Sequence, residues 1–404
     1  MKYVLVLADG MADEKVPSLG DKTPLQYANL PTINSLAQRG EIGKVKTIPD
    51  GMSPGSDTAN LSVMGYDPKV YHTGRSPLEA VSMGIDLADT DVTFRCNLVT
   101  LSEDDFYDEK VMLDNSAGEI SSEEAAILIR YINEQLGSAD ISFYPGVSYR
   151  HAVVWKNGSE GFKLIPPHDI LDRKITDYLP KEKEIDWVLS MMRKSYELLK
   201  DHPVNISRKE KGLKPANSIW IWGEGRKPRL DSFKNKYHLE GAVISAVDLV
   251  KGIGICAGLE SIDVPGATGN IHTNFDGKAM AGIDALKRGK DYVYLHVEAP
   301  DECSHQGDCS GKIRSMEIID EKIVKPIYDY LSSQGEPFKI LILPDHPTPI
   351  AIKTHTSDPV PFVLYDSTKE IYNKDNAFDE IAAEKSGMFF DAGYKLADYF
   401  LDKK

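Results

Sequence analysis

The stretch Tyr3-Val4-Leu5-Val6-Leu7-Ala8-Asp9-Gly10 is an apolar run that ends at an aspartate and a glycine. A short continuous run of this kind is typical of a strand buried on both faces of a parallel sheet. Three later runs have the same form and span residues 292–297, 339–343 and 360–365. The proline in the last run, Pro361, indicates an edge strand.

Helical patterns separate these runs, and the clearest covers residues 311–331, where apolar residues recur every three or four positions. Strands that alternate with helices predict an α/β fold with a mostly parallel sheet and helices on both faces. Residues 91–170 differ, because short strand-like runs there surround one amphipathic helix over 121–136. We therefore expect a core domain of residues 1–90 and 171–404, and a smaller inserted α+β domain of residues 91–170.

The composition excludes some classes of partner. The formal net charge is −15, whereas nucleic-acid-binding domains are usually basic, so we expect no nucleic-acid partner. No stretch approaches the roughly 20 apolar residues of a membrane helix, and we expect no membrane association and a cytoplasmic location. The 4 cysteines form no CxxC pair and are typical of reduced thiols. The oligomeric state stays open.

Several possible metal ligands directly follow the expected strands or lie close behind them: Asp9, Asp301, His305, Asp345, His346 and His355. In parallel sheets ligands bind beyond the carboxyl ends of the strands. Asp301 and His305 are one helical turn apart, and the adjacent Asp345 and His346 can face two different ions. A lone aspartate after a strand is often only a cap, but the whole set predicts a two-ion site. Mixed Asp and His ligands favour Mn²⁺ or Zn²⁺ over Ca²⁺.

The segment Pro54-Gly55-Ser56-Asp57-Thr58 places a serine at the head of an expected helix that runs to about Met64. Exposed N–H groups and the positive end of the helix dipole make such a position a natural phosphate seat. The alternative is a serine that only caps the helix, and this alternative is favoured for Ser56 taken alone. Beside a two-ion site, however, a metal-bound hydroxyl becomes a strong nucleophile.

Side chains that could bind an anionic substrate are found mainly in and around the expected insert: Arg75, Arg95, Asn97, Arg150 and His151, with Arg208 and Lys251 as weaker additions. An arginine pairs with a carboxylate or phosphate through two parallel hydrogen bonds. Any one of these arginines is as often solvated or ion-paired as it is a ligand.

Taken together, these motifs resemble the archaeal-type cofactor-independent (2,3-bisphosphoglycerate-independent) phosphoglycerate mutases of the alkaline phosphatase superfamily. The similar stretches are residues 54–68 (PGSDTANLSVMGYDP), 74–80 (GRSPLEA), 300–305, 345–349 (DHPTP) and 355–361 (HTSDPVP). They occur in the family's order, and the resemblance covers essentially the whole chain.

The resemblance implies an isomerase of glycolysis and gluconeogenesis that interconverts 2- and 3-phosphoglycerate through a phosphoserine at Ser56. It implies an alkaline-phosphatase-like sheet and two divalent ions, with Mn²⁺ expected and Zn²⁺, Co²⁺ or Mg²⁺ as alternatives. One ion would be held by Asp9, Ser56, Asp345 and His346, and the other by Asp301, His305 and His355. Arg95, Arg150 and His151 of the insert would close over the glycerate and exclude water.

The chain departs from the family pattern beside two ligand motifs. Glu302-Cys303-Ser304-His305-Gln306-Gly307 stands where the family has Glu-Ala-Gly-His-Asp-Gly, and Pro347 replaces a serine. These changes keep the ligands but flank the expected pocket, so the alternative is a homoserine kinase-like phosphotransferase or a phosphatase on the same fold and metal site. A catalytically inactive scaffold would require the loss of a ligand or of Ser56, and none is missing.

Overall fold

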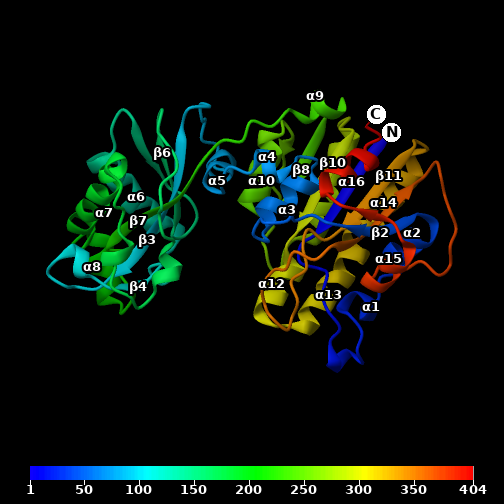
Figure 1. Cartoon of the computed structure of the whole chain (residues 1–404), viewed down its shortest axis with the longest axis horizontal. Helices are drawn as coiled ribbons and strands as arrows, with labels where there is room; N and C mark the ends of the chain where they lie inside the picture. The colour runs from blue at the N-terminus through cyan, green and yellow to red at the C-terminus, as the bar shows by residue number, and fades with distance from the viewer. Residues whose placement is uncertain (404) are drawn as a thin grey trace. The chain divides into compact units, whose positions relative to one another are not determined.

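The chain forms two compact units (Figure 1), and the computed structural model describes residues 1–403. The first unit consists of Met1–His72 and Arg229–Lys404, and the second consists of Thr73–Pro228. The second unit contains the expected insert of residues 91–170 but extends beyond it at both ends. Strand β7 (Ser218–Arg226) pairs with β3 (Val92–Leu101), and helix α5 (Ser76–Ser82) packs against both strands, which accounts for the wider bounds.

An eight-stranded sheet organises the described part of the first unit, in the order β13-β2-β12-β11-β1-β10-β8-β9. The sheet is mostly parallel, as predicted, because only the pairs that β12 forms with β11 and β2 are antiparallel. Its strands are β1 (Lys2–Ala8), β2 (Glu41–Val45), β8 (Gly241–Ile244), β9 (Glu260–Ser261), β10 (Tyr292–Val297), β11 (Phe338–Leu343), β12 (Val360–Asp366) and β13 (Phe389–Phe390).

The expected edge position of β12 is wrong, because this strand lies between β11 and β2. The pairs between β12 and β11 end at Val363, which lies opposite Ile342. Pro361 lies two residues beyond that point and is in register only with Lys44 of β2. The missing N–H of the proline therefore removes no hydrogen bond from the ladder with β11.

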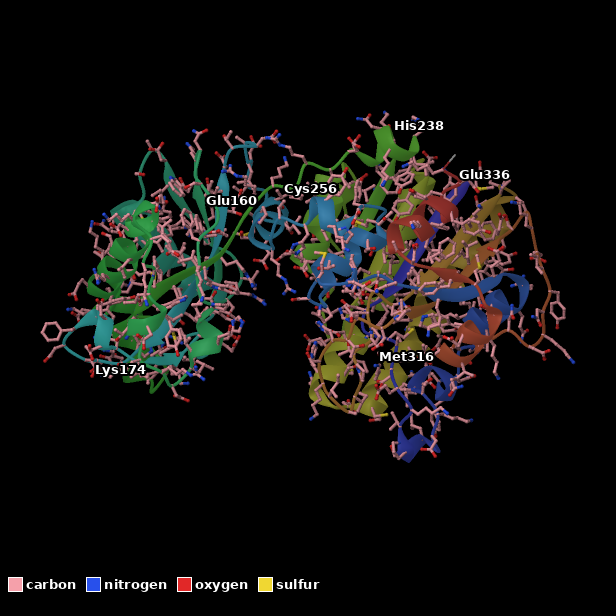
Figure 2. All side chains as sticks on the ribbon, in the orientation of Figure 1. Glu160, Lys174, His238, Cys256, Met316 and Glu336 are labelled. Atoms are coloured by element: carbon pink, nitrogen blue, oxygen red, sulfur yellow. The ribbon has the colours of Figure 1, made fainter. Side chains whose placement is uncertain are left out.

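Helices cover both faces of this sheet (Figure 1). One face packs with α2 (Pro31–Arg39), α11 (Phe275–Lys287), α13 (Cys309–Ile319) and α14 (Lys325–Gln334) around a core that includes the fully buried Met316 (Figure 2). On the other face lie α3 (Ser56–Val63), α10 (Asp248–Cys256) and α16 (Gly393–Phe400), and the ring of Phe400 meets that of Tyr3 edge-on. The remaining α-helices of this unit are α1 (Pro24–Tyr27), α4 (Pro68–Tyr71), α9 (Phe233–Tyr237), α12 (Ala299–Gln306) and α15 (Glu380–Ser386).

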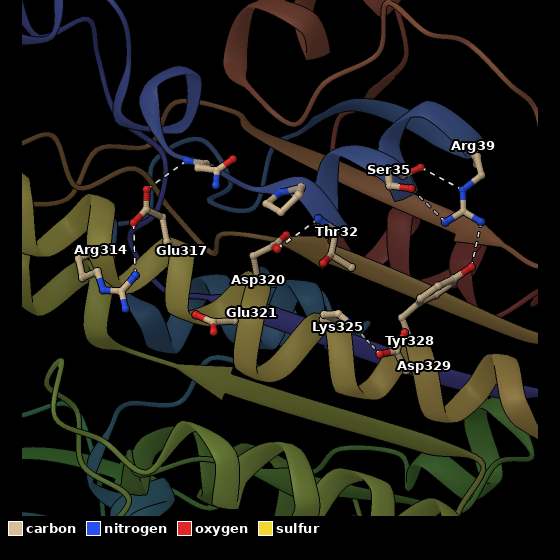
Figure 3. Close-up of a pocket in the computed structure, with 12 residues that line it drawn as sticks. Thr32, Ser35, Arg39, Arg314, Glu317, Asp320, Glu321, Lys325, Tyr328 and Asp329 are labelled. Carbon is tan, nitrogen blue, oxygen red and sulfur yellow. Dashed lines mark hydrogen bonds and ion pairs between the residues drawn. The ribbon is translucent and has the colours of Figure 1, made fainter.

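The helical stretch predicted over residues 311–331 is α13 and α14, joined by a π-helical segment, Asp320–Val324. Beside it lies a groove of about 520 Å³ (Figure 3). Asp320 accepts hydrogen bonds there from the amides of Thr32 and Ile33, at the start of α2. The π-helix thus turns a carboxylate toward the free N–H groups of a neighbouring helix.

The second unit has its own antiparallel sheet and core, which confirms the expected α+β character. Strands β4, β3, β6 and β5 are adjacent in that order within the described residues, and β7 pairs with β3. Strand β4 is Met112–Asp114, β5 is Ile141–Tyr144 and β6 is Arg150–Trp155, while α6 (Ser122–Leu136), α7 (Asp186–Leu199) and α8 (Pro203–Glu210) complete the unit. Among residues 1–403, no helix has the length and apolar composition of a membrane-spanning segment.

Candidate metal centre

Two groups of acidic and histidine side chains converge beyond the carboxyl ends of neighbouring strands. Strands β10, β1 and β11 are adjacent and parallel, so the segments that follow them meet at one edge of the sheet. These segments are the β1 loop (residues 9–13), helix α12 after β10, and the β11 loop (residues 345–350). The first group is Asp9, Asp345 and His346, and the second is Asp301, His305 and His355. Within each group the potential ligand atoms lie within 4.8 Å of one another.

Asp9 is the central member of the first group. Its Oδ2 lies 3.0 Å from His296 Nε2 and 3.5 Å from the hydroxyl of Ser56. Its Oδ1 is buried without a hydrogen-bond partner among the described residues. Burial, followed by the charges of Asp345 and Asp301, raises the pKa of this carboxyl well above its usual value. An unsatisfied buried oxygen within a set of Asp and His donors is what a bound divalent cation would satisfy, so the residues fit such an ion.

Ser56 is the first residue of α3, as the sequence predicts, and it belongs to the first group by distance. Its Oγ lies 3.2 Å from His346 Nε2. The residue at the N-cap position is Gly55, and no side-chain hydrogen bond caps the helix. The hydroxyl of Ser56 therefore faces the ligand group, in contrast to the alternative of a serine that only caps a helix.

Asn60 connects Ser56 with Asp345. Its side-chain amide donates to the carbonyl oxygen of Ser56 at 2.9 Å and to Asp345 Oδ2 at 3.1 Å. Its own Oδ1 accepts a hydrogen bond from the hydroxyl of Tyr294 at 2.6 Å. Our reading of the sequence missed this role, although Asn60 stands one helical turn after Ser56 and therefore on the same face of α3.

His296 is a second residue that the sequence interpretation missed. It is fully buried, and its Nδ1 lies 3.1 Å from Ser245 Oγ. Burial, followed by the charge of Lys278, lowers the pKa of His296 to about 3, so the ring is neutral. The neutral ring then donates from Nε2 to Asp9 and accepts at Nδ1 from Ser245. The sequence did contain one signal for this role, namely a histidine within an apolar strand run.

The second group is built from α12, whose first turn carries Asp301 and whose last turn carries His305, and from the loop that carries His355. His305 Nε2 lies 3.0 Å from Asp301 Oδ2, and His355 Nε2 lies 3.4 Å from Asp301 Oδ1. Burial would raise the pKa of Asp301, but hydrogen bonds from His305 and His355 outweigh it and hold that pKa well below its usual value. The hydrogen bond between His305 and Asp301 also raises the pKa of His305 to about 9. The two Nε2 atoms are 3.0 Å apart, so both rings face one point.

In the second unit, Arg95 and Asn97 lie on the same face of β3. The Nε of Arg95 forms an ion pair with Glu79 at 3.0 Å, and its guanidinium lies 4.4 Å from the centre of the Trp222 ring. Asn97 is buried and accepts a hydrogen bond from Trp222 Nε1 at 2.9 Å while it donates to the carbonyl of Asn115. Trp222 thus contacts both candidates and holds them side by side.

His151 and Arg150 begin β6 and differ in exposure. His151 is buried, and its Nδ1 accepts a hydrogen bond from the amide of Gly146 at 3.0 Å. Its Nε2 has no partner within residues 1–403, and burial lowers the pKa of its ring to about 3. Arg150 is exposed, and its guanidinium lies 5.4 Å from the centre of the Tyr149 ring.

The remaining candidates lie elsewhere. Arg75 is exposed at the start of α5, and Lys251 of α10 in the first unit forms an ion pair with Asp263 at 2.6 Å. Arg208 is buried, and its guanidinium bonds the carbonyls of Ala117 and Lys214 as well as the carboxylate of Glu124. These contacts explain Arg208 as a structural residue of the second unit, so we remove it from the candidate substrate ligands.

Comparison with known proteins assigns the chain to a family. A family model described as 2,3-bisphosphoglycerate-independent phosphoglycerate mutase matches residues 37–205. A Methanosarcina barkeri protein of that name is 51% identical over 390 residues, which are 96% of each chain. A Geobacter sulfurreducens protein, named as a probable enzyme of this kind, is 48% identical over 403 residues and 100% of each chain. The chain belongs to the 2,3-bisphosphoglycerate-independent phosphoglycerate mutase family.

Two solved structures are similar in fold to this chain. The structure of a Pyrococcus horikoshii protein is similar over 99% of this chain and 96% of its own, with a TM-score of 0.83 and 28% identity. The cofactor-independent phosphoglycerate mutase from Thermoplasma acidophilum is similar over 100% of this chain and 99% of its own, with a TM-score of 0.69 and 28% identity.

Proposed function

We propose that this chain is a metal-dependent phosphoglycerate mutase that interconverts 2- and 3-phosphoglycerate through a phosphoserine at Ser56. The observation that carries the proposal is the position of the Ser56 hydroxyl, 3.2 Å from His346 and 3.5 Å from Asp9, within a group of buried Asp and His side chains. The family membership supports the choice of substrate. As an enzyme of glycolysis and gluconeogenesis, it would act in the cytoplasm.

The residues that would hold two divalent ions form two sets: Asp9, Ser56, Asp345 and His346 for one ion, and Asp301, His305 and His355 for the other. The mixture of carboxylate and imidazole donors favours Mn²⁺, while Zn²⁺, Co²⁺ and Mg²⁺ stay alternatives. Bound there, such ions would lower the pKa of a hydroxyl and neutralise phosphoryl oxygens as Lewis acids.

Ser56 would carry the phosphoryl group between the two halves of the reaction. Its Oγ gives up its proton and attacks the phosphorus of phosphoglycerate, the bond from phosphorus to the glycerate oxygen breaks, and that oxygen takes up a proton. The other hydroxyl of the same glycerate then loses its proton and attacks the phosphorus of phosphoserine, the bond from phosphorus to Oγ breaks, and Oγ takes a proton back, which frees Ser56. Asn60 would keep Ser56 and Asp345 at a fixed distance during both transfers, because its side chain donates hydrogen bonds to both residues.

The proposed ligands for the carboxylate and phosphate of the substrate are Arg75, Arg95, Asn97, Arg150, His151 and Lys251. Arg95 and Arg150 offer the planar donor pairs that suit these groups. Water must be kept from the phosphoserine, since its hydrolysis would turn the mutase into a phosphatase.

A phosphorus NMR assay tests this proposal. Purified protein loaded with Mn²⁺ is incubated with 3-phosphoglycerate, and we expect 2-phosphoglycerate to appear until the two isomers reach equilibrium. Ser56→Ala should abolish the conversion while the circular dichroism spectrum stays unchanged. Release of inorganic phosphate alone would indicate the phosphatase alternative, and phosphorylation of homoserine by ATP would indicate the kinase alternative. The absence of 2-phosphoglycerate in the presence of Mn²⁺ contradicts the mutase.

A further inference from the structure

Lys312 of α13 is a buried lysine that lies next to the candidate metal centre without belonging to either ligand group. Its ammonium donates to Asp13 Oδ2 at 2.7 Å and to the carbonyl oxygens of Ala12 and Thr348 at 3.3 and 3.0 Å. These three acceptors match the three N–H donors of an ammonium group. Lysine is almost never fully buried unless it is paired, because transfer of a charge out of water is costly. A paired lysine at this depth therefore calls for an explanation.

The acceptors of Lys312 belong to the two loops that carry the first ligand group. Ala12 and Asp13 lie in the β1 loop, which begins with Asp9, and Thr348 lies in the β11 loop, two residues after His346. The loops also bond each other, since the amide of Thr348 donates to the carbonyl of Ala12 at 3.2 Å. All three N–H groups of Lys312 are thus used at the junction of these loops.

The second ligand group is connected to the same junction. The hydroxyl of Thr348 donates to Asp301. Helix α13, which carries Lys312, follows α12 directly, and Asp308 caps α13 by accepting the amide of Gly311 at 2.9 Å. A shift of the ammonium would therefore move segments that hold members of both groups.

Asp13 fixes the junction from the opposite side. Its carboxylate accepts the amide of Ile350 at 3.2 and 3.3 Å as well as that of Glu14 at 2.7 Å. The amide of Asp13 in turn donates to Glu380 of α15 at 3.1 Å. The ion pair between Lys312 and Asp13 is thus enclosed by four segments of the first unit, and backbone amides of two of them hold the Asp13 carboxylate in place.

We propose that Lys312 is a positioning residue of the metal centre, whose ammonium joins the β1 and β11 loops so that ligands from both loops reach the ions at fixed distances. This inference rests on the two-ion site proposed above. It predicts that removal of the ammonium weakens metal binding, even though Lys312 touches neither ion nor substrate. The effect should follow from the loosened loops, and excess metal should reverse it.

A merely structural lysine would stabilise the fold without any effect on metal affinity, and the chain offers a matched control. Lys339 at the beginning of β11 is also buried, and it pairs with Asp366 at 3.4 Å and Asp402 at 2.6 Å. It precedes Asp345 by six residues and lies at the opposite end of the same strand. Lys339→Met therefore removes a buried ion pair from the same unit and leaves the ligand loops intact.

The experiment compares metal-free wild type, Lys312→Met and Lys339→Met by calorimetric titration with Mn²⁺ and by thermal unfolding. Both variants should unfold at lower temperature than wild type. Only Lys312→Met should bind Mn²⁺ more weakly, by about 10–100-fold, the range expected when a supporting residue of a metal site is lost. Excess Mn²⁺ should return kcat of Lys312→Met to near the wild-type value, with an unchanged KM for phosphoglycerate.

Lys312→Arg covers the case in which Lys312→Met fails to fold. It keeps the charge, but a planar guanidinium cannot reproduce the three directions of an ammonium, so Mn²⁺ affinity should still fall several-fold. Wild-type affinity in a folded Lys312 variant, or an equal loss in Lys339→Met, overturns the inference. If wild-type protein binds no Mn²⁺, the proposed two-ion site itself is wrong. That result differs from the two outcomes that would overturn only the role of Lys312.

Discussion

The two ligand groups of the first unit differ in how the fold surrounds them. Asp9, Asp345 and His346 are almost completely buried, whereas the side chain of His305 is 36% exposed and that of His355 is 20% exposed. The first group extends directly from strand ends, while the second combines a helix with a loop. A ligand enclosed by protein cannot be replaced by water when it is lost, but an exposed ligand can. The first group should therefore determine whether the site works, and the second how tightly it holds its ion.

The largest effect is expected from Asp9→Asn. The change keeps the shape of the side chain but removes the buried negative charge at Oδ1, which has no hydrogen-bond partner in the described chain and lies 3.5 Å from His346 Nε2. We expect kcat to fall by about 10³-fold or more. Metal analysis of the purified protein should show the loss of one bound ion per chain. Retention of both ions with activity above a tenth of wild type contradicts a decisive role for the first group.

Metal removal should distinguish the two units of the chain. Both ligand groups lie in the first unit, and all 4 tryptophans, at positions 155, 187, 220 and 222, lie in the second. With free Mn²⁺ at about 100 times its Kd, the ion stabilises the first unit by about 2.7 kcal/mol. A chelator should therefore lower the calorimetric unfolding temperature of the first unit. The midpoint of thermal unfolding measured by tryptophan fluorescence, which reports on the second unit, should not change. An equal shift of both midpoints would contradict independent unfolding of the two units.

His305→Asn should have a smaller effect than Asp9→Asn, because water can enter at this exposed position and complete the coordination. We expect the activity at limiting Mn²⁺ to fall by about 10–100-fold and to recover largely at high Mn²⁺. Activity measured over a range of Mn²⁺ concentrations checks this. A loss that no Mn²⁺ concentration reverses would remove the proposed difference between the groups.

The smallest effect should come from Asn60→Ala, which leaves every proposed ligand in place. The variant loses the hydrogen bonds that connect Ser56, Asp345 and Tyr294, so we expect kcat to fall by about 10-fold. Tyr294→Phe serves as a graded control, since it removes only the bond to Asn60 and should lower kcat less. If Tyr294→Phe is the more damaging change, Asn60 does not act as the connecting residue.

The sequence predicted those parts of the fold that local patterns determine. The run of residues 292–297 is β10, because a continuous apolar stretch that ends at polar residues leaves little choice but a buried strand. The place of Pro361 was mispredicted, since a sequence does not show on which side a strand is paired. The bounds of the second unit depend on pairing between β3 and β7, which are more than 100 residues apart.

The same reasoning applies to the site. Asp9, Asp301 and Asp345 were recognisable because each follows a strand run and because the chain resembles a known family. His296, Asn60 and Lys312 were not, since their roles depend on partners 36 to 300 residues away that only the folded chain brings near. Arg208 shows the converse, because a buried arginine that bonds its own unit has the same sequence appearance as one that binds a substrate.

The position of β1 in the middle of its sheet has a consequence for how the chain reaches its fold. Its two neighbours, β10 and β11, begin at Tyr292 and Phe338, so both are made long after β1 and after the whole of the second unit. At the usual pace of translation the strand waits on the order of tens of seconds for either partner. The second unit can fold on the ribosome during this delay, while the apolar strand β1 stays unpaired. Protection of that strand in the newborn chain is therefore part of what the assembly of the metal centre requires.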